Sequence, residues 1–325
     1  MGSLAARHRL SCGPLLFILA VAPLAAQIPP APPEEPPVFR STAALVSVDT
    51  LVSWRGRPVS GLTAADFIVR EEGVVRPIEA FAHEAAPLQV LILLDVSGSM
   101  GRMLRSAAQT GRQALEQLAP QDGVAVFFFA RRAQLVQEVT ADRRLAARAL
   151  QDAAVESGLG AGTSLNDALL EAARYLEKLP PFSGRRALIV LTDNGGVHYR
   201  LPDEIVIRAL SGVNAVVNAI VPENVRPPRP ARGPDVNPDF TPADIFRIAR
   251  ATGGEVIQSS EAGLRLRDLI GRIRLRYSLM IRPSPAPPGT FRSLTVGLAP
   301  AAQARFPGAV LHHRAGYFVP ERAAQ

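Results

Sequence analysis

The chain has 325 residues, of which 47% are hydrophobic and 20% are charged. It therefore has enough apolar material for a folded domain with a smaller appendage, which excludes a disordered or fibrous protein. Its formal net charge of +7 is carried almost wholly by arginine, with Lys178 as the only lysine. Because the arginines are spread along the chain and form no dense block interleaved with aromatic residues, we do not expect nucleic acid as a partner.

Residues 1–26 have the pattern of a cleaved secretory signal peptide: a short basic stretch, an apolar run and small residues at its end. An uncleaved membrane anchor is the alternative, but the run is shorter than the roughly 20 residues that a spanning helix needs. The only cysteine, Cys12, lies in this segment, so the mature chain would have no disulfide and no thiol ligand. We expect an exported protein of the periplasm, cell surface or extracellular space, with no stable membrane span after cleavage.

The stretch that follows divides into a spacer and a small β unit. Residues 27–37 are rich in proline, which predicts an extended linker. Residues 38–85 alternate short β-branched segments with turn residues, which predicts an N-terminal β segment with strands at 44–52, 67–70 and 75–81.

Residues 86–275 alternate apolar strands with amphipathic helices. The continuous apolar run at 88–94 indicates a strand buried on both faces, and the alternation predicts an α/β fold with a doubly wound, mainly parallel sheet. The helix at 242–251 is expected to have Thr241 as its N-cap and Pro242 as its first residue. Strands are expected at 88–94, 124–129, 134–139, 187–191, 215–221 and 255–258, and helices at 103–118, 143–153, 165–179, 203–210, 242–251 and 262–275.

Residues 276–325 return to a strand pattern and form a C-terminal β segment, with strands expected at 277–282, 292–298 and 309–319. The two β segments flank the α/β part. We expect them to pair into one small antiparallel β domain into which the α/β part is inserted.

Side chains that carry oxygen atoms occur in three loops of the α/β part, each next to the end of a strand or the start of a helix. Asp95, Ser97 and Ser99 directly follow the first strand, Thr163 precedes a helix, and Asp193 follows a later strand. Ligands of open α/β sheets bind at the carboxyl ends of the strands, and hard cations such as Mg²⁺ and Ca²⁺ prefer oxygen ligands. These loops are therefore expected to converge on one cation.

This constellation resembles the metal-ion-dependent adhesion site (MIDAS) of the von Willebrand factor A (VWA) family. The resemblance covers roughly residues 88–275 and implies a Rossmann-like fold. It also implies that Ser97, Ser99 and Thr163 touch a divalent cation, Mg²⁺ or else Mn²⁺ or Ca²⁺, while Asp95 and Asp193 act directly or through water. A carboxylate from a protein or other acidic ligand would complete the shell. One departure is that Asn194, which tolerates left-handed geometry, follows Asp193 where the family has glycine.

The whole chain also resembles exported VWA-related proteins of acidobacteria and similar bacteria. The resemblance is carried by residues 59–67 near the start and by 276–279 and 314–317 near the end. This second resemblance supports the predicted domain architecture more strongly than it supports any particular activity.

Less specific explanations exist for several of these residues. Ser99, Thr163 or Ser164 could be helix N-caps, with Ser164 and Asp167 forming a capping box. Asp122 is expected in a turn before a strand. The calcium-like spacing of Asp235, Asn237 and Asp239 lacks the glycine and glutamate of a calcium loop. The adjacent His312 and His313 would point to opposite faces of a strand and so could not chelate one ion together, and His198 is expected on a surface loop.

The function expected from these features is an exported module that binds a protein or acidic ligand through a divalent cation, and not an enzyme. The alternatives are a hydrolase that uses the metal site with Asp95, Ser97 or His198, and a purely structural envelope component. No nucleophile elbow, zinc-protease motif or P-loop occurs in the sequence. The partner's identity and the oligomeric state do not follow from the sequence.

Overall fold

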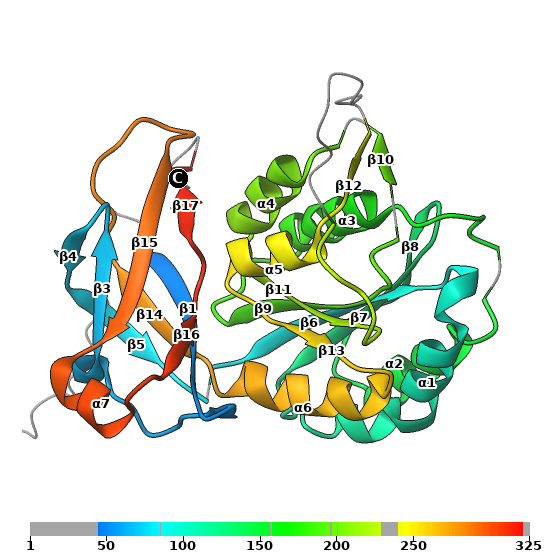
Figure 1. Ribbon diagram of the computed structural model, residues 1–325, viewed down its shortest axis with the longest axis horizontal. Helices are drawn as coiled ribbons and strands as arrows, with labels where there is room; N and C mark the ends of the chain where they lie inside the picture. Colours follow the sequence, from blue (N-terminus) through cyan, green and yellow to red (C-terminus); the bar gives the residue numbers. More distant parts are fainter. Residues whose placement is uncertain are drawn as a thin grey trace, which may run out of the picture. The chain divides into compact units, whose positions relative to one another are not determined.

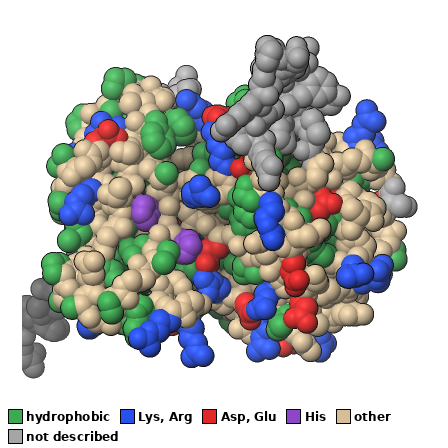
Figure 2. All heavy atoms as spheres, in the orientation of Figure 1, with side chains coloured by type: hydrophobic (Ala, Val, Ile, Leu, Met, Phe, Trp, Pro, Cys, Tyr) green, Lys and Arg blue, Asp and Glu red, His purple; other side chains and the backbone are tan. Residues whose placement is uncertain are grey.

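The computed structural model describes residues 45–84, 86–156, 158–195, 197–199, 201–228 and 240–320, all within one compact unit, Thr42–Gln325. The expected signal peptide, the proline-rich linker, and Asp235, Asn237 and Asp239 lie outside these residues. Within the described part, no helix is both long and apolar enough to cross a membrane. Arginine and lysine side chains are scattered over the face shown in Figure 2, interspersed with acidic ones.

A six-stranded sheet forms the centre of the α/β part, in the order β13-β11-β9-β6-β7-β8 (Figure 1). All neighbours are parallel except β8, which runs antiparallel to β7. The expectation of a mainly parallel sheet is therefore confirmed. The strands are β6 (Leu88–Asp95), β7 (Gly123–Phe129), β8 (Ala133–Thr140), β9 (Arg185–Leu191), β11 (Ala215–Val221) and β13 (Val256–Gln258).

Helices cover both faces of this sheet, which explains why β6 is apolar from Val90 to Leu94. Its residues Val90 and Ile92 join a core with α1, α2 and α6, whereas Leu91 and Leu93 join a second core with α3, α4 and α5. Each of these side chains is fully buried, so each contributes on the order of 2 kcal/mol of apolar stabilisation. The helices are α1 (Gly101–Leu115), α2 (Arg143–Asp152), α3 (Leu165–Lys178), α4 (Asp203–Gly212), α5 (Ile245–Thr252) and α6 (Ala262–Arg274).

The strands before and after the α/β part pair with one another, as expected. β1 pairs with β14 and β3 pairs with β15, both antiparallel, around a separate core that includes Val69, Tyr277 and Leu294. The elements of this β domain are β1 (Val46–Trp54), β2 (Arg57–Pro58), η1 (Ala64–Asp66), β3 (Phe67–Glu71), β4 (Val74–Arg76), β5 (Ile78–Ala82), β14 (Tyr277–Ile281), β15 (Phe291–Leu298), α7 (Pro300–Arg305), β16 (Val310–His312) and β17 (Gly316–Phe318).

Some elements differ from those expected. The expected cap at Thr241 is wrong, because the chain there forms β12 (Phe240–Pro242) against β10 (Val197–Tyr199). Helix α5 begins later, and its N-cap is Asp244, whose carboxylate accepts hydrogen bonds from two backbone amides of the first turn. The run expected as one strand at 75–81 is split between β4 and β5, and α7 was not predicted.

Glu71 holds several chain segments of the β domain together. Its carboxylate is fully buried and accepts hydrogen bonds from Ser284 Oγ (2.5 Å), Tyr317 Oη (2.5 Å) and Arg76 Nε (3.0 Å). Burial alone would raise the pKa of Glu71, but the hydrogen bonds from Ser284 and Tyr317, with the nearby Arg292 guanidinium, outweigh it and lower the pKa from 4.5 to about 2. The buried carboxylate is therefore stabilised in its charged form.

We predict that Glu71→Gln lowers the free energy of unfolding at pH 7 by on the order of 3 kcal/mol. The folded-state pKa of Glu71 lies below the unfolded value, so its stabilisation is complete above pH 4.5 and is lost as the pH falls towards 2. Urea denaturation of the wild type and the variant across this range measures the difference. The exposed Glu79→Gln is the control; equal pH dependence in wild type and Glu71→Gln would contradict the assignment.

Candidate functional site

Asp95 is the last residue of β6 and the most buried member of the predicted site. β6 lies between β7 and β9, and all three are parallel, so their carboxyl ends meet at one edge of the sheet. The residue is 0% exposed. The packing of β6 thus fixes a carboxylate at the edge where the neighbouring loops converge.

Both oxygens of Asp95 accept hydrogen bonds. Ser97 N donates to Oδ1 at 3.0 Å, and Thr192 Oγ1 donates to Oδ2 at 2.8 Å. Thr192 follows β9, so its hydroxyl links two strand ends. Thr192 was not among the residues predicted for the site. Its position just before Asp193 at the end of a strand was the available signal.

Ser97 and Ser99 connect this pair to Asp193. The two serine Oγ atoms lie 3.3 Å apart, and Ser99 Oγ donates to Asp193 Oδ2 at 2.5 Å. Ser97 stands at the N-cap of the short helix η2 (Gly98–Met100), yet its side chain makes no capping hydrogen bond. Four of the five predicted residues are therefore linked by hydrogen bonds, with Asp95 joined to Ser97 through the Ser97 backbone amide.

Thr163 lies on the loop before α3, which is bound to the same edge of the sheet. Ser164 N donates to Ala130 O at 2.7 Å, and Val96 N donates to the preceding carbonyl, Phe129 O, at 2.8 Å. The loops that carry Thr163 and Ser97 are thus attached to consecutive carbonyls at the end of β7. Among the described residues, no hydrogen bond joins the Thr163 side chain to the other four. The capping box proposed for Ser164 does not form, because Ser164 makes no side-chain cap at α3.

Asn194 gives the loop after β9 its turn. Its φ is 55°, in the left-handed region that asparagine tolerates, as expected from the sequence. Its backbone amide donates to Thr192 Oγ1 at 3.1 Å, and its side-chain oxygen accepts from Ile245 N, at the start of α5, at 3.1 Å. Asn194 therefore supports both the site and the helix beside it.

The electrostatics of the cluster favour a cation. Burial is the largest influence and raises the pKa of Asp95 to about 6; the charge of Asp193 adds to this, and the hydrogen bonds from Ser97 and Thr192 oppose it. Two carboxylates with hydroxyl groups between them form the all-oxygen donor set that Mg²⁺ and Ca²⁺ prefer. No three histidine, cysteine, aspartate or glutamate side chains gather at a possible metal site within the described ranges. A cation here would depend on the hydroxyls, and the residues present fit such an ion.

The other residues considered from the sequence have structural partners. Asp122 is fully buried and accepts from Leu88 N at 2.9 Å and Ala119 N at 2.7 Å, and it is paired with Arg274, so it fixes the turn before β7. His312 lies 3.6 Å from Glu255 Oε1, while His313 accepts from the backbone amide of Val296 at 3.2 Å. The two histidines thus have separate environments.

Comparison with known proteins finds a family that matches a segment of the α/β part. The family described as von Willebrand factor type A domain matches residues 90–196, which include Asp95, Thr163 and Asp193. The observed α/β fold, with its mixed and mostly parallel central sheet, agrees with this match. No curated protein matches the chain.

Three of the similar solved structures span different shares of the chain. An aerotolerance-related membrane protein from Bacteroides fragilis is 21% identical and covers 57% of this chain and 98% of its own, with a TM-score of 0.44. A von Willebrand factor type A protein from Catenulispora acidiphila is 15% identical and covers 87% and 75%, with a TM-score of 0.44. Proximal thread matrix protein 1 from the mussel byssus, with a zinc-occupied MIDAS motif, is 19% identical and covers 64% and 50%, with a TM-score of 0.45.

We predict that Asn194→Ala destabilises the protein more than Asn194→Gly does. Both variants lose the hydrogen bond to Ile245 N, worth about 1 kcal/mol, but only alanine adds a penalty of about 1 kcal/mol for left-handed backbone. Chemical denaturation gives the two differences in the free energy of unfolding. Two unaffected variants would show that neither the turn nor the helix contact matters for stability.

Proposed function

Because residues 90–196 match a von Willebrand factor type A domain, we propose that this chain binds a divalent cation through Asp95, Ser97, Ser99, Thr163 and Asp193 and uses it to capture an acidic partner. The observation that carries the proposal is that hydrogen bonds link Asp95, Ser97, Ser99 and Asp193 in one cluster at the carboxyl end of β6. Domains of this family mediate protein interactions, and a carboxylate of a protein is the partner group that suits a cation.

Each residue has a distinct part in this proposal. Hydrogen bonds from Ser97 N and Thr192 Oγ1 orient the Asp95 carboxylate, which supplies negative charge. Ser97, Ser99 and Thr163 supply neutral hydroxyl ligands, which leave most of the charge of the ion uncompensated. Asp193 already contacts Ser99, so a bound cation would interact with its carboxylate directly or through water. An under-neutralised cation attracts a further carboxylate.

Binding is proposed here in preference to catalysis. Among the described residues, neither Asp95 nor Asp193 forms an ion pair or hydrogen bond with a histidine, lysine or arginine that could assist proton transfer. Mg²⁺ is the proposed cation, and Mn²⁺ or Ca²⁺ would suit the same oxygen groups. Export to the periplasm, cell surface or extracellular space is also part of the proposal, supported by the composition of residues 1–26.

We predict that Asp95→Asn loses Mg²⁺ binding without loss of stability in the absence of metal. The oxygen of asparagine can still accept from Ser97 N, and its amide group can donate to Thr192 Oγ1, which reverses that bond. The change also removes a buried charge near Asp193. Mg²⁺ at about 100 times its Kd should stabilise the wild type by about 2.7 kcal/mol and the variant not at all. Thermal unfolding with Mg²⁺ or with chelator tests this. The exposed Asp167→Asn, which makes the same change beside Thr163, should behave as the wild type; a Mg²⁺ effect retained in Asp95→Asn would refute the site.

A second experiment separates partner capture from a purely structural metal. We predict that a glutamate-rich peptide added to the Mn²⁺-loaded protein lowers the water-proton relaxation enhancement, because its carboxylates replace water on the ion. A glutamine-rich peptide of equal length is the control. An unchanged relaxation rate with both peptides would favour the structural alternative, and release of hydrolysis products would favour the hydrolase.

A further inference from the structure

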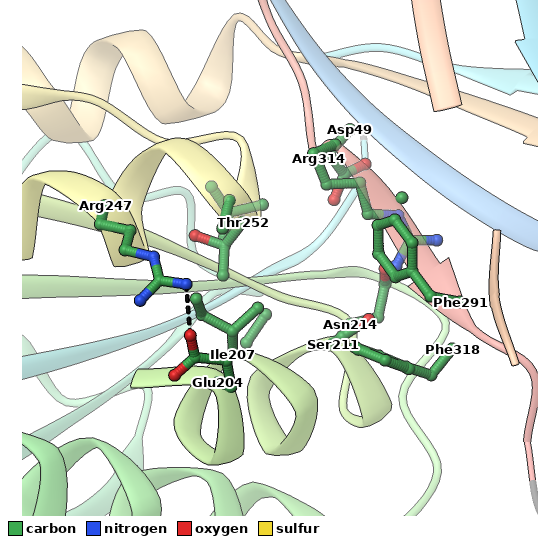
Figure 3. A pocket seen from close by; sticks show the side chains of 15 residues that line it. Asp49, Glu204, Ile207, Ser211, Asn214, Arg247, Thr252, Phe291, Arg314 and Phe318 are labelled. Carbon is green, nitrogen blue, oxygen red and sulfur yellow. Dashed lines mark hydrogen bonds and ion pairs between the residues drawn. The ribbon is translucent and has the colours of Figure 1, made fainter. Parts of the chain in front are cut away.

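A cavity of about 200 Å³ is lined by residues of both the α/β part and the β domain, and Asp95 is not among them. Figure 3 shows that its walls come from α4 and α5 on one side and from the C-terminal strands on the other. The metal proposal makes no use of this cavity.

Arg314, in the wall of this cavity, is a buried cation without an acceptor. The residue is 9% exposed, its Nε is fully enclosed with no hydrogen-bond partner, and no carboxylate lies within ion-pair distance of its guanidinium among the described residues. Among the described residues, its guanidinium lies over the ring of Tyr317, whose centroid is 5.9 Å from Cζ, and interacts electrostatically with Asp49. Burial lowers the pKa of Arg314 to about 10, so it stays charged at neutral pH.

Two other buried arginines, which also lie where the α/β part meets the β domain, have hydrogen-bond acceptors for their guanidinium groups. Arg276 Nη2 donates to the carbonyls of Asp49 (2.9 Å), Gly253 (2.6 Å) and His312 (3.1 Å). Arg185 likewise donates to three carbonyls at the end of α6. Arg314 lacks acceptors of this kind, and a buried charge without hydrogen bonds is strongly destabilising.

The local charge balance favours an incoming anion. Asp49 interacts with Arg185, Arg276 and Arg314 alike. Arg185 also interacts with Glu84, and Arg276 also interacts with Glu255. Within the described part of the chain, Asp49 is the one carboxylate that acts on Arg314. Asp49 is itself engaged, because Ser278 Oγ donates to its Oδ1 at 2.6 Å. On the opposite side of the cavity Glu204 and Arg247 neutralise each other at 2.5 Å (Figure 3).

The rest of the wall is mainly apolar. Phe291, Phe318, Ile207, Val216 and Ala251 line it, and Phe291 is 47% exposed, so one aromatic wall reaches the surface. An enclosed apolar space with a single unsatisfied charged donor is the usual form of a small-molecule site.

We propose that this cavity binds a compact monocarboxylate with an aromatic or branched apolar body. The carboxylate accepts hydrogen bonds from the Arg314 guanidinium, whose planar fork matches a carboxylate. The apolar body packs against the aromatic wall formed by Phe291 and Phe318, whose ring centroids lie 5.2 Å apart. The site is independent of the cation, because none of the metal-site residues lines the cavity.

Phenylacetate is the test probe, and phenylacetamide, of the same shape but without charge, is its control. Ligand-observed NMR and calorimetry on the full chain should detect phenylacetate binding, unchanged by chelator, and a loss of roughly tenfold or more for phenylacetamide and for Arg314→Met. Arg208→Met is the matched variant, because Arg208 lies over the Phe318 ring at 4.2 Å but outside the cavity lining. It should bind phenylacetate as the wild type does.

The thermal stability of Arg314→Met shows whether a loss of phenylacetate binding could come from misfolding of the variant. An apolar side chain in place of an unpartnered buried charge should leave the unfolding midpoint of the ligand-free protein unchanged or raised. The proposal is overturned if the wild type does not bind phenylacetate at millimolar concentration, if phenylacetamide binds equally well, or if a folded Arg314→Met retains binding. A failure here would leave the cation proposal untouched, because that is measured by Mg²⁺ alone.

Discussion

The burial of β6 on both faces is the constraint on which the candidate metal site depends. Its apolar side chains belong to two separate cores, so the strand cannot shift without disrupting both. Asp95 ends this strand and is carried into a fully buried position. A carboxylate is costly there unless it is hydrogen-bonded or neutralised, and Ser97 and Thr192 supply the hydrogen bonds. The neighbouring Asp193 adds repulsion, which a cation would offset.

Buried arginines play the corresponding part where the α/β part meets the β domain. Arg276 and Arg185 bind backbone carbonyls of several segments and so connect α6, α5 and the C-terminal strands. Gly253, with φ of 86°, allows the end of α5 to approach this junction, since a Cβ there would lie 2.4 Å from Arg314 N. The backbone segments are therefore closely packed where the two parts meet. Unlike Arg276 and Arg185, Arg314 has no hydrogen-bond acceptor for its guanidinium there among the described residues.

Much of the α/β architecture could be predicted from the sequence, because its pattern is periodic. The run from Leu88 to Leu94 indicated a doubly buried strand, and Asp95, Ser97 and Ser99 followed it at the edge where ligands bind. The start of α5 could not be predicted, because Pro242 suits either a first helical turn or an edge strand, and only the pairing of β12 with β10 decides between them. The contact of Thr192 with Asp95 and the isolation of Arg314 depend on residues distant in sequence, so no local pattern could reveal them.

The most direct test of the cation proposal is calorimetric titration of Mg²⁺ and Mn²⁺ into the wild type and into the double variant Asp95→Ala with Ser97→Ala. The account predicts saturable binding to one site in the wild type and none in a folded double variant. Absence of binding to the wild type, or equal binding to both proteins, would contradict it.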